Sequence, residues 1–464
     1  MKSPRLLLLP LIAAFVAAMP APAADGWVSL FDGKTLNGWK ASENPGSPQV
    51  RDGAIVAEGK RAHLFYVGDD GRAEFENFEL ELEIKTEPGA NSGVYFHTKW
   101  QDSGWPSAGF ESQVNNSQPP FKEQDYRENK KTASLYGIRN LYKAMAKDGE
   151  WFTMNIRVAR PRVEIRLNGR LVSAYTEPAN PVLPTPGPKL NLLGKGTFAL
   201  QCHDEDSRAY YRNIRVRRLP PGEDASVVKP VFSEQDLRRL ALGKDNFPIV
   251  NLRVRLGDAL TLEQLLALRL ETGIGAGIVT ESGELTDDAA VASFTALCRD
   301  QPVHAGLLAV ERGWTKRLPP TTRARFDYII GQVAPATTAA QWTDEAVRII
   351  ESEPVDILAD DAGRPALNAE QTARLIAAAA KHGVAFEIGA QRSALTADFI
   401  RQAKAAGVKF AIGSSERTSA ANWSDWTQVL ALQREAVLGW KDIYVPGHFP
   451  TRAQRELATA ASKL

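Results

Sequence analysis

The hydrophobic positions of this chain follow one period in its first half and another in its second. Over residues 27–219 apolar and polar side chains alternate, most regularly in FELELEIK at 78–85 and MNIRV at 154–158. Alternation with a period of two predicts strands that bury one face and expose the other. The dipeptide Asn168-Gly169 separates two such runs and supplies the positive φ angles of a type I′ hairpin turn. The pattern therefore predicts a large antiparallel β-sandwich over residues 25–219.

A second pattern begins after the Pro- and Gly-rich stretch at 220–230, which we interpret as a linker. Residues 261–264 (TLEQ) and 368–371 (NAEQ) have the sequence of capping boxes and predict helices that run to Arg269 and Lys381. Short apolar runs alternate with helical segments at 249–254, 276–280, 303–310, 326–330, 355–359, 384–388, 408–412 and 443–445. Because such alternation is typical of parallel βαβ units, we expect an α/β domain, a (β/α) barrel, over residues 231–464.

The first 24 residues have the features of a secretory signal peptide. Lys2 and Arg5 are basic, residues 6–16 are almost wholly apolar, and APA at 21–23 fits a cleavage site. The apolar run is shorter than the roughly 20 residues that a membrane-spanning helix needs. We therefore expect a secreted protein without a membrane span, located in a bacterial periplasm.

Composition narrows the range of partners. Lys plus Arg is 56 and Asp plus Glu is 55, so the formal net charge is +1. This balance lacks the basic footprint of a nucleic-acid-binding protein, and we expect no nucleic-acid partner. Cys202 and Cys298 fall in different predicted domains, so we expect two buried free thiols and no disulfide. The composition does not predict the oligomeric state.

Several short motifs stand in order along the predicted sandwich. They are LFDGKTLNGW at 30–39, NSGVYFH at 91–97, GFESQVN at 109–115, SLYG at 134–137, and QCHD at 201–204 followed by YRNIRV at 211–216. Through these motifs residues 27–219 resemble the 3-keto-disaccharide hydrolase domain family. The resemblance implies a concanavalin-like jelly-roll sandwich and an enzyme that cleaves glycosides whose sugar is oxidised to a ketone at C3. Its substrate would be an oligosaccharide or another glycoside.

The chemistry that this resemblance implies requires few residue types. A C3 ketone acidifies the proton on C2, so the site needs a base, a group that stabilises the enolate oxygen and an acid for the leaving group. Glu111, Gln113 and Asn115 alternate along one predicted strand and therefore face the same side. We take Glu111, His97 and His203 as the catalytic candidates, and their residue types do not decide which of them is the base.

Other polar residues of the motifs are candidate substrate contacts. Tyr95 and His97 share one predicted strand face, and Gln201 and His203 share another. Asp204 could orient the ring of His203, and the ring of Tyr136 could stack on a sugar. The candidate substrate-binding residues are thus Tyr95, Gln113, Asn115, Tyr136, Gln201 and Asp204.

Three further features of the sandwich leave alternatives open. The aromatic residues Trp100, Trp105 and Phe110 either form a platform for a sugar ring or belong to the core. A divalent cation could bind the donor atoms of His97, Glu111, His203 and Asp204, but without a local ligand spacing we assign no metal ligand. The charged segment 118–131 departs from the family pattern, as does Ala133, where we expect a glycine. This departure is expected to reshape the substrate cleft.

The predicted barrel lacks the residues of a metalloenzyme. NLRVRL at 251–256 resembles the opening strand of PHP-like metal-dependent phosphoesterases and amidohydrolases, where the pattern is His-x-His. Here Arg253 and Arg255 occupy both histidine positions, and only Glu311 remains as a candidate ligand. Arginine stays protonated and repels a cation, so we expect no metal in the barrel. The barrel is then either an inactive structural pseudoenzyme or, through Arg253, Arg255 and Arg417, an anion-binding domain.

The leading hypothesis is an exported carbohydrate-active hydrolase or lyase that cleaves 3-keto-glycosides in the sandwich. The alternative is a non-catalytic glycan-binding module, which would need only aromatic and amide side chains. The linkage, anomer and aglycone of the substrate are not predicted.

Overall fold

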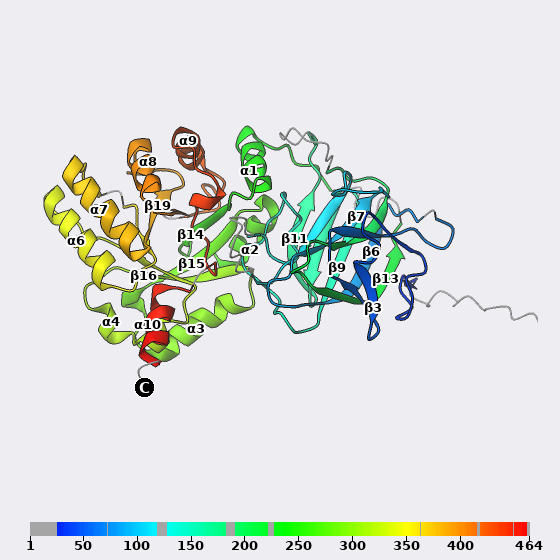
Figure 1. Ribbon diagram of the computed structural model, residues 1–464. Coiled ribbons are helices and arrows are strands. Elements are labelled where there is room, and N and C mark those ends of the chain that lie inside the picture. The colour runs from blue at the N-terminus through cyan, green and yellow to red at the C-terminus, as the bar shows by residue number, and fades with distance from the viewer. Residues whose placement is uncertain are drawn as a thin grey trace, which may run out of the picture.

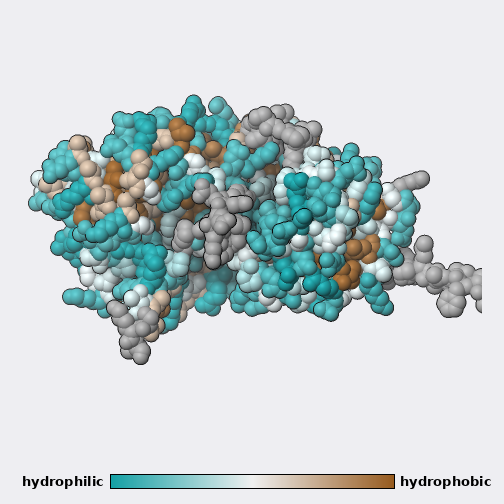
Figure 2. Space-filling model, viewed as in Figure 1, coloured by the Kyte–Doolittle hydropathy of each residue, from teal (hydrophilic) through white to brown (hydrophobic). Residues whose placement is uncertain are grey.

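The computed structural model describes residues 26–71, 73–117, 128–181, 191–220, 227–361, 363–414, 418–448 and 450–461. The predicted signal peptide, residues 118–127 of the charged segment, most of the linker and Arg417 lie outside the described residues. Within these ranges no helix has the length and apolar character needed to cross a bilayer. The face drawn in Figure 2 is mainly hydrophilic, with small separate apolar patches.

The first domain is a sandwich of two antiparallel sheets that share one hydrophobic core (Figure 1). The larger sheet has the order β11-β10-β9-β6-β13-β4-β3, with β1 paired to β13. Its strands are β1 (Val28–Ser29), β3 (Pro48–Arg51), β4 (Ala54–Ala57), β6 (Phe78–Thr86), β9 (Phe152–Ala159), β10 (Arg162–Leu167), β11 (Arg170–Thr176) and β13 (Ala209–Arg218). The smaller sheet has the order β2-β5-β12-β7-β8. Its strands are β2 (Trp39–Ala41), β5 (Ala62–Tyr66), β7 (Ser92–Thr98), β8 (Phe110–Val114) and β12 (Thr197–Cys202).

The alternating sequence pattern explains this architecture. In β6 every second side chain is buried, as predicted. The predicted hairpin joins β10 and β11, and Asn168 and Gly169 have φ angles of +48° and +81°. Phe78 of the larger sheet packs edge-on against Phe96 of the smaller one, with ring centroids 6.0 Å apart. The predicted sandwich is therefore confirmed.

The second domain contains a parallel sheet in the order β14 to β20. Its strands are β14 (Val250–Val254), β15 (Gly275–Glu281), β16 (Val303–Ala309), β17 (Tyr328–Gly331), β18 (Ile357–Leu358), β19 (Ala385–Gly389) and β20 (Phe410–Gly413). Its helices are α1 (Glu234–Lys244), α2 (Leu262–Thr272), α3 (Asp288–Arg299), α4 (Trp314–Arg317), α5 (Pro320–Arg323), α6 (Ala339–Ser352), α7 (Ala369–His382), α8 (Ala397–Ala405), α9 (Thr427–Glu435) and α10 (Arg452–Ala461), with short 3-10 turns at Ser282–Glu284 and Trp440–Asp442.

This parallel sheet nearly closes into the predicted barrel. Asn251 of β14 donates a 2.6 Å hydrogen bond to the hydroxyl of Ser414, directly after β20. The predicted eighth strand at 443–445 is reduced to an isolated bridge between Ile443 and Phe410. Both predicted capping boxes are confirmed, and α2 and α7 extend to Thr272 and His382. Whether the barrel is of the PHP-like type stays a prediction.

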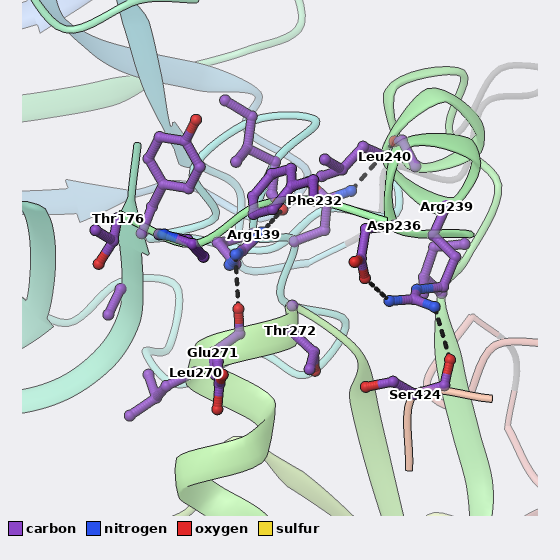
Figure 3. A pocket seen from close by; sticks show the side chains of 18 of the residues that line it. Arg139, Thr176, Phe232, Asp236, Arg239, Leu240, Leu270, Glu271, Thr272 and Ser424 are labelled. Atoms are coloured by element: carbon purple, nitrogen blue, oxygen red, sulfur yellow. Dashed lines mark hydrogen bonds and ion pairs between the residues drawn. The ribbon is translucent and has the colours of Figure 1, made fainter. Parts of the chain in front are cut away.

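Residues 128–143, which we call the docking segment, lie between the two domains. The backbone N–H groups of Ala133 and Tyr136 donate to the carbonyls of Gln113 and Glu111 in β8, both at 2.9 Å. Elsewhere in the segment, Tyr142 is buried in the barrel interior. A cavity of about 580 Å³ is lined by part of the segment together with residues of α1 and α2 (Figure 3). Both cysteines are free and buried, as predicted.

Candidate active site

A buried carboxylate stands on β8, the strand at one edge of the smaller sheet. Glu111 in β8 is opposite Tyr95 in β7, whose hydroxyl donates a 2.7 Å hydrogen bond to Oε2. Gln201 in β12 donates to Oε1 at 3.0 Å and to the Tyr95 hydroxyl at 3.1 Å. A Cβ atom at Gly93 would lie 2.4 Å from Oε1, so only glycine leaves room for this carboxylate. Three of the predicted residues therefore converge.

Burial fixes the protonation of Tyr95. Desolvation, followed by the nearby charge of Glu111, raises the pKa of Tyr95 well above its ordinary value. The hydroxyl therefore keeps its proton and acts as a donor to the carboxylate. Glu111 is buried, with 7% of its surface exposed, and each of its oxygens can accept more than one hydrogen bond.

Lys130 lies near this cluster, within electrostatic range of Glu111, and sequence reasoning missed it. Its side chain is buried, its Nζ lies 3.6 Å from Glu128 Oε1, and it lies 4.1 Å from the ring centroid of Tyr136. Burial lowers the pKa of Lys130, and the charges of Glu128 and Glu111 partly oppose that shift. Its Nζ forms no hydrogen bond to any described residue. Lys130 lies in the charged segment whose sequence gave no sign of a site.

Tyr136 is held beside Glu111 by the docking segment. Its backbone pairs with that of Glu111, and its ring, half-buried, lies under Lys130. Ala133, where the family resemblance led us to expect glycine, has a φ angle of +70°, a conformation that favours glycine. The structure thus places Tyr136 beside Glu111, while its role as a substrate contact stays a prediction.

His97 does not join the cluster, and its predicted pairing with Tyr95 on one strand face is wrong. A positive φ angle of +53° next to a register shift between β7 and β12 turns its ring away. The ring packs on Phe78 in the core, with a centroid distance of 5.5 Å. Its Nδ1 accepts a hydrogen bond from Gly194 N at 3.2 Å and its Nε2 donates to Glu76 O at 2.9 Å, which requires the neutral ring. Burial lowers the pKa of His97 to about 4.

A different histidine and a tryptophan complete the face around Tyr95. The buried ring of His63 in β5 meets the Tyr95 ring edge-on at 5.3 Å and lies 5.6 Å from Trp105. Trp105 is 42% exposed, and Gln101 holds its loop by donating to Trp105 O at 3.0 Å. Sequence reasoning did not select His63, because it stands outside the recognised motifs.

His203 lies at the outer side of Trp105, with ring centroids 5.2 Å apart. Its Nδ1 is 2.5 Å from Asp204 Oδ2, so the predicted orientation of the imidazole by this carboxylate is present. Burial acts to raise the pKa of Asp204, but hydrogen bonds from His203 and Ser207 bring it below its ordinary value. Of the other predicted platform residues, Trp100 is half-buried and Phe110 belongs to the core.

Two predicted substrate contacts have internal partners instead. Gln113 Nε2 donates to Asn91 Oδ1 at 2.7 Å, and the side chain is buried. Asn115 Nδ2 donates to the carbonyls of Glu128 and Lys130 at 3.0 and 3.2 Å. Asn115 therefore holds the start of the docking segment and does not face a substrate.

The donor atoms predicted for a cation do not gather. The ring of His97 is in the core with both nitrogens engaged, while Glu111 binds Tyr95 and Gln201. Within the described ranges no group of three or more His, Cys, Asp or Glu side chains is arranged to hold a metal ion. The residues present therefore do not fit the cation considered from the sequence.

The carboxyl ends of the barrel strands contain an internal ion-pair cluster. Arg253 donates to Glu387 Oε2 at 2.6 Å and to Asp361 Oδ1 at 3.0 Å. Burial raises the pKa of Glu387 to about 7, although the Arg253 charge opposes this shift. Arg255 pairs with Glu281 at 2.5 Å, and Glu311 pairs with Arg317. Arg253 and Arg255 of the predicted anion pocket are thus paired with carboxylates of the protein itself.

Comparison with known proteins gives matches to the sandwich. Residues 26–217 match the family described as 3-keto-alpha-glucoside-1,2-lyase-like domain. A 3-keto-disaccharide hydrolase from Bacteroides thetaiotaomicron is 30% identical over 232 residues, which cover 42% of this chain and 79% of that protein. A Parabacteroides distasonis structure provisionally named a glycosyl hydrolase is 23% identical, with a TM-score of 0.35, and covers 42% of this chain and 95% of its own. A second structure from that organism, with the same provisional name, is 28% identical, with a TM-score of 0.33, and covers 42% and 99%.

Proposed function

Because this chain belongs through residues 26–217 to the family of 3-keto-alpha-glucoside-1,2-lyase-like domains, we propose that its sandwich cleaves the glycosidic bond of 3-keto-glycosides. The observation that carries the proposal is the buried Glu111 carboxylate with Tyr95, Gln201 and Lys130 around it. A sugar ring would enter beside Trp105, which is exposed next to this cluster.

The reaction follows from the acidity that the C3 ketone confers on C2. A base takes the C2 proton, and the electrons of the broken C–H bond form a C2=C3 enolate. The enolate then collapses: the C3 carbonyl re-forms, a C1=C2 double bond forms, and the C1–O bond breaks. The leaving oxygen takes a proton, which completes the lyase reaction. Addition of water across C1=C2 then gives the hydrolysis product.

The side chains around Glu111 match these requirements. Glu111 is the proposed base, since Tyr95 and Gln201 fix the orientation of its carboxylate. Lys130 is a buried amine within electrostatic range of Glu111, and in its charged form it would stabilise the enolate oxygen in a site of low dielectric. His203, oriented by Asp204 at the outer side of Trp105, is the proposed acid for the leaving group.

An assay on two matched substrates tests this proposal. A 3-keto-glucoside and the same glucoside without oxidation are offered to the wild type and to Glu111→Gln. We expect release from the 3-keto substrate only, and a loss of about 100-fold or more in kcat for the variant. Glu81→Gln, in strand β6 of the larger sheet, is the matched control and should keep full activity. Addition of a chelator should leave the rate unchanged.

Two results would contradict the proposal in different ways. Equal release from both glucosides would indicate an ordinary glycosidase that does not use the ketone. No release from either, together with measurable binding of glycans, would indicate the recognition module that is the alternative function.

For the barrel we propose a catalytically inactive domain of the PHP-like type. The support is the ion-pair cluster around Arg253, where a metalloenzyme of that type would hold its ligands. We also propose export to the periplasm, from the sequence of residues 1–24. Fractionation of the source bacterium tests the location, and a cytoplasmic protein with an intact leader would contradict it.

A further inference from the structure

Three barrel helices end against the docking segment of the sandwich. Asn140 Nδ2 donates to Gly243 O in the last turn of α1 at 3.1 Å, and Arg139 donates to Glu271 O in the last turn of α2 at 2.6 Å (Figure 3). Lys143 Nζ donates to Cys298 O in the last turn of α3 at 2.6 Å. The last four carbonyls of a helix lack partners within the helix, and cations are favourable there. The segment therefore donates to carbonyls in the last turns of these three helices, in addition to their backbone C-caps.

The docking segment also fills the amino-terminal end of the barrel. Tyr142 is buried among the interior residues of the barrel, with Val250 and Tyr328, and its hydroxyl accepts a 2.9 Å hydrogen bond from Ile249 N. A Cβ atom at Gly275 would lie 3.0 Å from the Tyr142 ring, so the first residue of β15 leaves space for it. Active sites of such barrels lie at the carboxyl ends of the strands, which is the opposite end. The sandwich is thus held at the amino-terminal end of the barrel, away from the end where active sites of such barrels lie.

The same segment carries two residues of the proposed site. Asn129 donates to Asn246 O, just beyond α1, at 2.7 Å, and the next residue is Lys130. Asn115 fixes the carbonyl of Lys130 from the sandwich side. A few residues later, Tyr136 pairs with the Glu111 backbone. The position of both side chains therefore depends on contacts that the barrel makes.

We infer that the barrel is a positioning domain for the reaction of the sandwich, acting through residues 128–143. Asn129 and Lys143 are the positioning residues: they touch barrel carbonyls and hold Lys130 and Tyr136 against Glu111. This inference rests on the proposed function, because it assigns Lys130 and Tyr136 to the reacting site. It gives the barrel a role although the barrel itself carries out no chemistry.

The test compares two lysines that make the same kind of contact. Lys143→Met removes an ammonium group that joins the docking segment to the barrel. Lys404→Met removes one that donates to Val437 O at 2.6 Å and also pairs with Asp442 at 3.0 Å, both within the barrel, and serves as the control. In the full-length protein we expect Lys143→Met and Asn129→Ala to lower kcat about ten- to a hundred-fold, because a displacement of about 1 Å costs that much. KM should change little, and Lys404→Met should keep the wild-type kcat.

Amide hydrogen exchange gives a readout that does not depend on turnover. The amides of Ala133 and Tyr136 should exchange faster in both docking variants, while those of β6 stay unchanged. Should Lys143→Met fail to fold, Asn129→Ala, which removes one amide group, supplies the test. Wild-type kcat or unchanged exchange in the docking variants would overturn the inference. A wild type that ignores the 3-keto substrate would overturn the proposed function instead.

Discussion

One backbone angle separates His97 from the face on which Tyr95 and Glu111 lie. Its φ of +53° places the ring in the core, where Gly194 N and Glu76 O fix the neutral tautomer. A strict strand alternation, which is all that the sequence offers, predicts the opposite direction. Glu111, Tyr95 and Gln201 were predictable because the strand pairing immediately around them is regular, so the period of two gives the correct face for each of them.

The buried His97 makes the stability of the sandwich dependent on pH. Its pKa is about 4 in the folded chain, against 6.5 in the ordinary range, because burial disfavours the charged ring. Between these values the unfolded chain binds a proton that the folded chain does not, so the free energy of unfolding falls as the pH falls from 6.5 to 4. A shift of this size corresponds to a loss of about 3 kcal/mol.

Chemical denaturation at a series of pH values measures this contribution. In His97→Asn the fall over the same pH window should be smaller by that amount, although the variant is less stable at neutral pH. An identical pH dependence in the variant would show that other groups cause the acid sensitivity.

At the scale of elements, the docking segment joins β8 to the barrel, and Asn115 begins this connection. Its amide donates to two carbonyls, those of Glu128 and Lys130. In Asn115→Asp a carboxylate oxygen would face both carbonyls, so we expect a loss of about 1–3 kcal/mol in stability. We also expect a lower kcat, because Lys130 loses its support.

Gln433→Glu is a matched control for this substitution, since Gln433 donates an amide hydrogen bond to Leu438 O in the barrel at 2.9 Å. Thermal unfolding and kcat are measured for both variants. The control should lose stability and keep its kcat. A wild-type kcat in a folded Asn115→Asp would contradict the role given to this connection.

The arrangement of these elements was only partly predictable. Both capping boxes, the Asn168-Gly169 turn and the alternation in β6 are local signals, and they predicted helices, a hairpin and a strand correctly. Lys130 and Asn115 acquire their roles from contacts within the docking segment and between it and the end of β8, which lie outside any one helix or strand. No local period encodes such contacts, which is why Lys130 was missed and Asn115 was assigned to the substrate.

At the scale of the whole molecule, the two ends of the barrel have different roles. The end at Tyr142 holds the sandwich, and the end at Arg253 contains an internal ion-pair cluster. Arg253→Met would leave the carboxylates of Glu387 and Asp361 without their cation. Removing one partner from a buried pair costs about 3–5 kcal/mol.

We therefore expect Arg253→Met to lower the free energy of unfolding by about that amount and to leave kcat of the folded protein unchanged. Arg312→Met, which removes an exposed partner of Glu345, should cost about 1 kcal/mol or less. Denaturant unfolding and the 3-keto-glucoside assay measure the two effects. A loss of activity in folded Arg253→Met would indicate a site in the barrel.

The central claim is that the sandwich cleaves its substrate by removing the proton on C2. The most direct measurement uses a 3-keto-glucoside that carries deuterium at C2, with Glu111→Gln as the control for spontaneous exchange. We predict slower cleavage than with the unlabelled substrate and loss of the deuterium from the sugar product. Cleavage at the same rate, with the deuterium retained at C2, would contradict elimination and point to direct attack at C1.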